Sequence, residues 1–153
     1  GRGGGQPGAA RRWRAAALGG MTPGEPCPCG SGQRYAACCG PLHAGERPAA
    51  SAEALMRSRY SAYVLKLADY LLATWHPSTR PSELDLAADD SKWLGLDVKR
   101  HDVQDDDRAT VEFVARYRIA GRGYRLHEIS RFVREDGSWF YLDGDLKGGI
   151  AAA

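Results

Sequence analysis

The segment Cys27–Cys39, CPCGSGQRYAACC, contains all four cysteines of the 153-residue chain, in the pattern C-x-C, eight residues, then C-C. Four thiolates this close together indicate a metal ion, and zinc first, because zinc prefers four tetrahedral ligands and binds all-thiolate sets in structural sites. Four protein ligands leave no coordination position open, so the pattern predicts a structural ion rather than a catalytic one. Metal binding would then supply the folding free energy that so short a segment lacks.

Other interpretations of the cysteines are weaker. A disulfide interpretation needs a bridge within the C-x-C pair, a bridge within the C-C pair, or two crossed links, and the first two are strained by disulfide geometry. Iron–sulfur clusters also take four thiolates, but with wider spacings. Within the zinc interpretation, His43 is an alternative to one of the adjacent cysteines, because Cys39 and His43 would share a helix face. Gly40–Pro41 argues against that helix, since both residues are expected to end it.

The cysteine segment and the sequence that follows it resemble known proteins. CPCGSGQRYAACCG resembles the SEC-C motif, a small zinc-binding element found at the C-terminus of the bacterial translocation ATPase SecA and in other proteins. The segments GPLHAGERPAASAEALMRSRYSAYV, TWHP, WLGLDV, FVARY and SRFVREDGSWFYLDG resemble the bacterial YchJ family, in the same order. Members of that family have an N-terminal SEC-C motif followed by an NTF2-like domain, and their biochemical function is not established. Some members carry a second C-terminal SEC-C motif, whereas this chain ends in LKGGIAAA without a further cysteine.

The resemblance implies a division of the chain into a SEC-C-like element at 21–45 and an NTF2-like domain at 46–148. Residues 1–20 are rich in glycine, alanine and arginine, so they are expected to be disordered. They are also expected not to belong to the native protein, because MTPGEPCPCG, from Met21, begins where the resemblance begins. A targeting peptide is an alternative for which the apolar run is too short, and a basic arm is another. Residues 149–153 are expected to form a disordered tail.

Charge and hydropathy limit the classes of partner. The formal net charge is +2, but residues 1–20 contain four arginines and no acidic residue. The remaining chain has 17 basic and 19 acidic residues, so its net charge is −2. A near-neutral body gives no support for nucleic-acid binding. No stretch approaches the length of a membrane span, and clustered reduced thiols favour a cytoplasmic location.

The chain after the cysteines predicts an α+β fold. Ser51 is the expected N-cap of a helix whose apolar positions recur at helical spacing as far as Leu67, and Tyr70 to Trp75 is an expected second helix. Ser82 to Ala88 is an expected third. The period then changes to two, which predicts strands at Trp93–Val103, Ala109–Ile119, Tyr124–Arg134 and Ser138–Asp145. Short polar or glycine-bearing breaks favour antiparallel neighbours. The NTF2-like resemblance further implies a cone, with the helices packed on a curved four-stranded sheet.

Such a cone would leave an apolar pocket between the sheet and the helices. The candidate lining residues are Trp75, His76, Trp93, Phe113, Tyr117, Glu128, Ser130, Phe132 and Tyr141, with Asp143 near a rim. Because side chains alternate along a strand, Glu128 faces the core if Phe132 does. A buried carboxylate needs a partner, and Arg57, Arg59 and His76 are the candidates.

Two hypotheses for the function follow. The first is a non-enzymatic binding or adaptor protein. Its zinc module docks on a protein partner through Gln33, Arg34 and Tyr35, and its pocket holds a small apolar ligand or its surface forms a homodimer. The second is an enzyme acting on a small molecule by acid–base chemistry, with Glu128 or Asp143 as general base working with His76. We favour the first, because the chain has no phosphate loop, dinucleotide fingerprint or nucleophile elbow.

Overall fold

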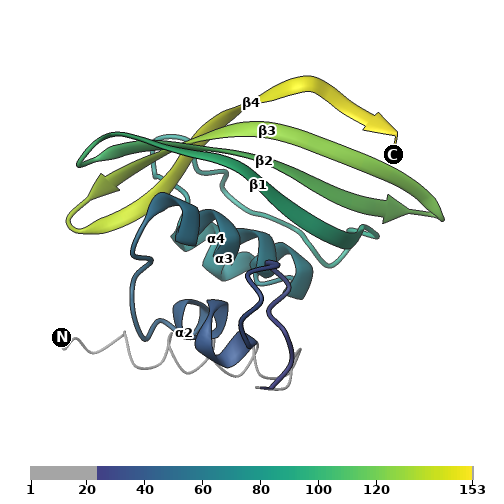
Figure 1. Ribbon diagram of the computed structural model, residues 1–153, viewed down its shortest axis with the longest axis horizontal. Coiled ribbons are helices and arrows are strands. Elements are labelled where there is room, and N and C mark those ends of the chain that lie inside the picture. The colour runs from purple at the N-terminus through teal and green to yellow at the C-terminus, as the bar shows by residue number, and fades with distance from the viewer. Residues whose placement is uncertain (1–23, 153) are drawn as a thin grey trace.

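The computed structural model describes residues 24–152, and side chains as far as Lys147, so the expectations for residues 1–20 lie outside the described part. The elements are a 3₁₀ turn η1 (Tyr35–Ala37), helices α2 (Cys39–His43), α3 (Ala52–Leu65) and α4 (Ala68–Ala73), and strands β1 (Lys92–Asp105), β2 (Arg108–Ile119), β3 (Arg122–Glu135) and β4 (Ser138–Ala152). The sheet covers one side of α3 and α4, and the cysteine segment with α2 lies on the other side (Figure 1). The predicted α+β class is confirmed.

Helix α3 forms the centre of the molecule. Ser51 caps its N-terminus, as expected, and its Oγ accepts a hydrogen bond from the amide of Ala54 at 3.1 Å. The helix turns an apolar face to the sheet, where its side chains pack with alternate residues of β2 and with one residue of β3. The buried members of this core are Ala52, Leu55, Met56, Tyr60, Ala109, Val111, Phe113, Ala115 and Phe132. Burial of this alternating strand face against one helix holds the two layers together.

The four strands form one antiparallel sheet in the order β1-β2-β3-β4. The sheet curves over the helices (Figure 1). Register shifts interrupt β1–β2 pairing at three places and β3–β4 pairing at two. Such irregularities bend a strand and increase its twist, so they account for a curvature that alternation alone does not predict.

Two segments differ from the sequence expectations. No helix forms at 82–88, where only Leu86 is buried, so the segment lacks the apolar stripe that a packed helix needs. The expected tail at 149–153 is strand as far as Ala152, because β4 continues to pair with β3, for example Ile150 with Leu126. Residue 153 lies outside the described part.

Helix α2 also differs from the expectation. Gly40–Pro41 was expected to prevent a helix after the cysteines, yet both residues lie inside α2. Pro41 is the third residue of the helix, in the first turn, where a missing N–H costs no helical hydrogen bond. A Cβ on Gly40 would lie 2.8 Å from the carbonyl oxygen of Tyr35, so glycine allows the close approach of η1 to α2.

Candidate metal centre and aromatic cavity

The four cysteine side chains meet at one point. The Sγ atoms of Cys27, Cys29, Cys38 and Cys39 all lie within 4.8 Å of one another, and no disulfide joins them. Cys29 Sγ is 3.5 Å from Cys38 Sγ, which is 3.9 Å from that of Cys39. Sulfurs at the corners of a tetrahedron around zinc, with bonds of about 2.3 Å, are about 3.8 Å apart. The donor set and its spacing therefore fit one thiophilic metal ion.

The local backbone explains how thirteen residues bring the sulfurs together. Gly30 and Gly32 both have positive φ, and the amide of Cys27 donates to the carbonyl of Gln33 at 2.9 Å, so the loop folds back on itself. Cys38 has φ −123° and ψ −100°, outside both helix and strand. This irregular residue turns two adjacent cysteines toward the same point.

Contacts among the four sulfurs raise the pKa of two of the cysteines and lower the pKa of the other two. Hydrogen bonding from Cys39 is the main cause that lowers the pKa of Cys38 to about 6, and contact with Cys27 lowers the pKa of Cys29. Contact with Cys29 raises the pKa of Cys27 to about 11, and contact with Cys27 raises that of Cys39. Without a cation, some sulfurs therefore keep their protons. Metal binding requires thiolates, so binding of an ion by these four cysteines would release the remaining protons and would depend on pH.

The cysteine element is fixed to helix α3. Ser61 Oγ lies 3.5 Å from Cys39 Sγ and 3.6 Å from Cys27 Sγ, and Arg57 Nη1 donates to the carbonyl oxygen of Cys29 at 2.8 Å. The sulfurs thus receive polar contacts from the domain behind them, as metal ligands commonly do.

His43 and Tyr35 form a buried pair under the cysteines. Nε2–H of His43 donates to the carbonyl of Ser58 at 2.8 Å, which leaves Nδ1 to accept from the hydroxyl of Tyr35 at 2.7 Å. Both ring nitrogens are therefore engaged away from the sulfurs, and the structure does not place His43 among the ligands. Tyr35 is 1% exposed, so it packs inside and its ring is not offered to a partner.

The buried imidazole predicts a pH dependence of stability. Burial lowers the pKa of His43 from 6.5 to about 4, so the unfolded chain binds a proton there at a higher pH than the folded chain does. The stability from the neutral ring is present above pH 6.5 and is lost as pH falls toward 4. Between pH 7 and pH 5.5 we expect the free energy of unfolding to fall by about 1 kcal/mol through His43, measured by urea unfolding with metal content checked at both pH values.

His43→Gln is the matched control, because glutamine does not titrate and its amide can still donate to Ser58. Its stability should fall by about 1 kcal/mol less than that of the wild type over the same range. Equal falls in the two proteins would contradict the buried neutral imidazole.

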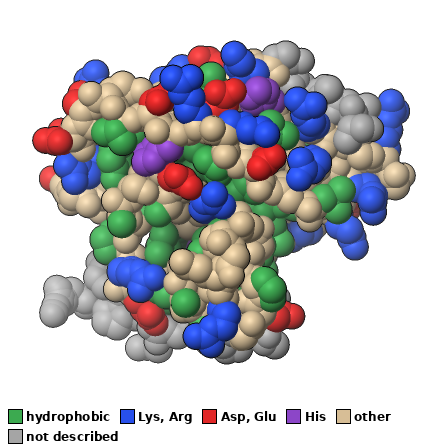
Figure 2. Space-filling view, viewed as in Figure 1, with side chains coloured by type: hydrophobic (Ala, Val, Ile, Leu, Met, Phe, Trp, Pro, Cys, Tyr) green, Lys and Arg blue, Asp and Glu red, His purple; other side chains and the backbone are tan. Residues whose placement is uncertain are grey.

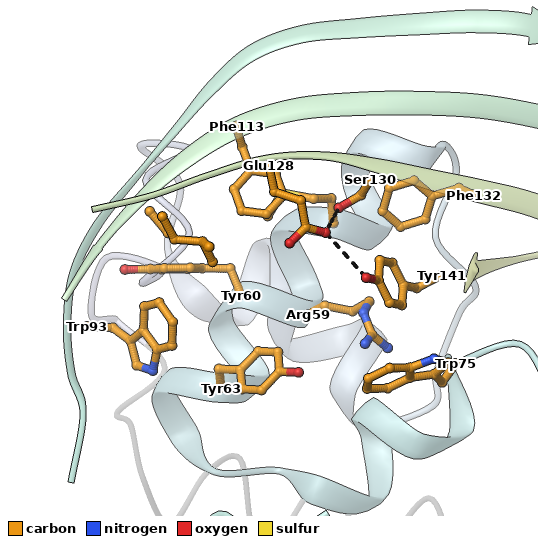
Figure 3. A pocket seen from close by; sticks show the side chains of 13 residues that line it. Arg59, Tyr60, Tyr63, Trp75, Trp93, Phe113, Glu128, Ser130, Phe132 and Tyr141 are labelled. Atoms are coloured by element: carbon orange, nitrogen blue, oxygen red, sulfur yellow. Dashed lines mark hydrogen bonds between the residues drawn. The ribbon is translucent and has the colours of Figure 1, made fainter. Parts of the chain in front are cut away.

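A second feature is a cavity of about 290 Å³ between α3 and the sheet. Helix α3, the segment after α4 and all four strands contribute to it, mostly with aromatic side chains (Figure 3). The lining residues are Met56, Arg59, Tyr60, Tyr63, Trp75, Trp93, Phe113, Ala115, Leu126, Glu128, Ser130, Phe132 and Tyr141. Its volume is near the lower end of the range for small-molecule sites, so it suits a ligand of about one ring system.

The structure places most of the sequence candidates around this cavity and leaves three outside it. Trp75, Trp93, Phe113, Glu128, Ser130, Phe132 and Tyr141 line it. Tyr117 does not line the cavity but packs against the lining residue Trp93, with the two ring centroids 5.1 Å apart. His76 binds Ser78 and Glu135 at 2.8 and 2.9 Å, away from the cavity.

Asp143, the third residue outside, accepts a hydrogen bond from Arg131 at 2.5 Å. It was expected near a rim of the pocket and near the end of the strand Ser138–Asp145, and it lies inside β4. The next residue, Gly144, allows a close contact between β4 and Glu128 of β3. A Cβ on Gly144 would lie 2.9 Å from Cδ of Glu128.

Glu128 is held in the cavity by neutral groups. Its Oε2 accepts hydrogen bonds from Ser130 Oγ at 2.7 Å and from the hydroxyl of Tyr141 at 3.3 Å. Its other oxygen points away from both donors (Figure 3). Within residues 24–147 no cationic side chain lies within the 4 Å of an ion pair with Glu128. The structure thus gives the carboxylate two hydrogen bonds in place of the expected arginine or histidine partner.

Arg59 is the buried cation of the same cavity, with 6% of the residue exposed. Its Nη1 donates to the carbonyl of Leu71 at 2.8 Å and to Thr74 Oγ1 at 2.7 Å. The guanidinium carbon lies 5.0 Å from the ring centroid of Trp75 and 4.7 Å from that of Tyr141, between the two rings (Figure 3). Burial lowers the pKa of Arg59, and the negative charge of Glu128 acts in the opposite direction.

The sequence analysis named Arg59 as a candidate partner for Glu128, but it did not predict the helix side of the cavity. Met56, Tyr60 and Tyr63 belong to the apolar positions that recur along this helix, and they line the cavity. The spacing 56, 59, 60 and 63 places all four side chains on one helix face, which is the signal that could have found them.

Charged side chains are scattered over the visible surface, among hydrophobic and other side chains (Figure 2). Lysine, arginine, aspartate and glutamate are mixed over the sheet in Figure 2, with basic side chains gathered toward the end that carries the β2–β3 hairpin. The exposed basic residues at that end are Lys92, Arg116, Arg118, Arg122 and Arg125. No helix among residues 24–152 has the length and apolar character that crossing a bilayer requires.

The fold and the cysteine cluster together define a protein with a SEC-C motif in front of an NTF2-like domain. Residues 25–41 match the SEC-C motif, and residues 51–144 match the middle NTF2-like domain of YchJ. These ranges lie inside the expected 21–45 and 46–148. The chain belongs to the YchJ family, whose similar curated members are UPF0225 proteins.

Relatives and solved structures agree with this assignment. A UPF0225 protein of Bordetella pertussis is 61% identical over 123 residues, covering 79% of this chain and 92% of that protein. A UPF0225 protein of Ralstonia nicotianae is 57% identical over 141 residues, covering 85% and 97%. A SEC-C motif containing protein from Rhodopseudomonas palustris, solved in solution, has 43% identity and a TM-score of 0.71, covering 78% of this chain and 96% of that one. The crystal structure of a SEC-C motif containing protein from Psychrobacter arcticus has 31% identity and a TM-score of 0.70, covering 83% and 86%.

Proposed function

We propose that this chain is a non-enzymatic zinc-binding adaptor. Its SEC-C element docks on a protein partner, and its NTF2-like cavity holds a small, mainly apolar ligand. The observation that carries the proposal is the separation of the acid–base candidates. His76 and Asp143 are paired with Glu135 and Arg131 outside the cavity, so Glu128 meets neither of them. A cavity with one carboxylate held by two hydroxyls is suited to binding rather than to proton transfer between two groups.

The metal in this proposal is a structural Zn²⁺ held by Cys27, Cys29, Cys38 and Cys39. Zinc is favoured because the four donors are all sulfur and their spacing fits a tetrahedron. All four protein ligands are present, so the ion would order the loop without offering an open position to a substrate. Thiols that remain free and gather around zinc are typical of reducing compartments, which supports a cytoplasmic location.

The docking surface in this proposal is the outer loop of the SEC-C element. Gln33 and Arg34 are exposed, whereas Tyr35, the third expected recognition residue, is buried. Arg57 and Ser61 fix the element to α3, so the loop is presented by a rigid base. A preorganised loop loses little conformational entropy when it binds, which favours its use as a docking site.

Affinity capture tests the docking part of the proposal. The double variant Gln33→Ala, Arg34→Ala should lower the yield of a specific captured protein by about tenfold, since two contact residues are removed. Its metal content should match that of the wild type, because neither side chain is a proposed ligand. Arg118→Ala, which removes an exposed arginine on the sheet, serves as the control and should capture normally. Undiminished capture by the double variant would count against docking through this loop.

The second candidate function is an enzyme in which Glu128 acts as the only general base. One observation supports this second function. One oxygen of Glu128 is turned away from both hydroxyl donors and toward the aromatic cavity (Figure 3). Such an enzyme would need the bound molecule itself to supply the acid, because neither His76 nor Asp143 lines the cavity.

A further inference from the structure

The cavity contains two opposite charges that do not neutralise each other directly. Arg59 and Glu128 both line it, and they are not within the 4 Å of an ion pair. Arg59 lies against the C-terminal end of α4 and donates hydrogen bonds to Leu71 and Thr74. Glu128 lies on β3 and accepts a hydrogen bond from Ser130. The two charged groups therefore have separate hydrogen-bond partners, and both border the aromatic cavity.

The polar groups restrict the net charge of any occupant. An anion next to Arg59 would meet the negative field of Glu128, and a cation next to Glu128 would meet that of Arg59. A zwitterion would match both signs, but an ammonium needs three acceptors and a carboxylate needs several donors. The exposed lining is mostly carbon, so such an ion pair would lose more hydration than the cavity replaces.

A neutral group that carries a hydrogen-bond acceptor next to a donor can contact both Arg59 and Glu128. It needs fewer hydrogen-bond partners from the cavity than a zwitterion does. Building on the proposed small-ligand site, we propose that the cavity binds a small ring-bearing amide or lactam. Its carbonyl oxygen faces Arg59, and its N–H donates to the oxygen of Glu128 that Ser130 and Tyr141 leave unengaged. The ring packs among Tyr60, Trp93 and Phe113, which lie on the far side of Glu128 from Arg59 (Figure 3). Aromatic walls of this kind supply the apolar contact, and the charged pair supplies orientation.

The test uses five probes that share one ring and differ in the attached group. These are benzamide, benzoate, benzylammonium, phenylglycine and toluene, titrated into the zinc-loaded full chain while the indole N–H signals of Trp75 and Trp93 are followed by NMR. We expect benzamide to bind about tenfold more tightly than each of the others. It makes both charge-assisted hydrogen bonds without the repelled charge of benzoate or benzylammonium and without the loss of hydration that zwitterionic phenylglycine undergoes.

Glu128→Gln separates recognition by charge from simple filling of the space. Glutamine keeps an oxygen that can accept from Ser130 and Tyr141, so the variant should fold. It should bind benzamide about tenfold more weakly and benzoate more tightly than the wild type does. Glu112→Gln is the matched control, because Glu112 pairs with His127 at 2.7 Å and lies outside the cavity lining. Its affinities for all five probes should equal those of the wild type.

The other outcomes divide the two proposals. Tighter binding of benzoate, benzylammonium or phenylglycine, or equal binding of toluene and benzamide, overturns the amide inference and leaves the small-ligand cavity standing. Unchanged selectivity in Glu128→Gln also overturns it. If none of the five probes moves the indole signals at its solubility limit, both the inference and the small-ligand part of the proposed function fail.

Discussion

Replacing Cys29 by serine should abolish tight metal binding and unfold the segment 25–45. Cys29 is 0% exposed, and its sulfur lies 3.5 Å from that of Cys38. A serine hydroxyl is a poor zinc ligand, and the apparent free energy of structural zinc sites in small domains is about 10–16 kcal/mol. Protein purified without added zinc should contain one metal ion per chain as wild type and almost none as Cys29→Ser. Amide hydrogen exchange should show lost protection in the cysteine element.

The control for this variant is Ser31→Ala. Ser31 Oγ lies 3.2 Å from Cys38 Sγ, but it supplies no ligand atom to the group. This variant should keep one metal ion per chain and normal protection. If wild-type protein proves metal-free and still ordered at residues 25–45, or if Cys29→Ser retains the ion, then the cysteines do not share one zinc.

The loss should spread beyond the cysteines in a defined direction. Arg57 donates to the carbonyl of Cys29, and His43 donates to that of Ser58, so the element and α3 share polar contacts. Unfolding of the element would expose His43 and the face of α3 at Ser61, which now contacts the sulfurs of Cys27 and Cys39. We expect reduced protection from hydrogen exchange in the part of α3 that contacts the cysteine element. Protection should be retained in β2 and β3, whose core residues pack on the other face of α3.

Local sequence signals predicted most of the fold. Ser51 is a strong N-cap, and the alternation of Val111, Phe113 and Ala115 defines a strand with one buried face. Features that depend on distant packing were not predictable in this way. Pro41 was expected to prevent a helix, whereas it lies in a first turn that tolerates proline. The extension of β4 to Ala152 depends on the length of its partner strand rather than on its own glycine- and alanine-rich sequence.

The candidate site was also predicted only where local sequence patterns determine it. Glu128, Ser130 and Phe132 were placed on one strand face by their period of two, and all three line the cavity. His76 was also expected in the lining, but its neighbour Trp75 forms a bridge with Tyr141, and the side chain of His76 lies outside. No local pattern predicts this bridge, since it joins residues that are far apart in sequence.

Replacing Arg59 by methionine should lower the free energy of unfolding by about 3 kcal/mol. Methionine replaces the aliphatic stem of arginine and has a similar helix propensity, so the change removes mainly the guanidinium. The carbonyl of Leu71 and the hydroxyl of Thr74 would lose their donor, and two aromatic rings would lose the cation between them. A buried acceptor without a partner costs about 1–3 kcal/mol, and a desolvated cation–π contact contributes about 2 kcal/mol. Release of a buried charge opposes these losses and limits the total.

Arg57→Met provides the comparison, because it changes the same residue type two positions away on the same helix. Arg57 is more exposed, pairs with Glu53 at 3.0 Å and donates to Cys29, so its loss should cost about 1 kcal/mol. Urea unfolding of both zinc-loaded variants at one pH gives the ordering. An Arg59→Met protein at least as stable as the wild type would contradict the prediction. It would mean that the buried guanidinium lowers stability, as isolated buried charges often do, and a charge with that cost is better explained by a ligand that it binds than by the helix that it contacts.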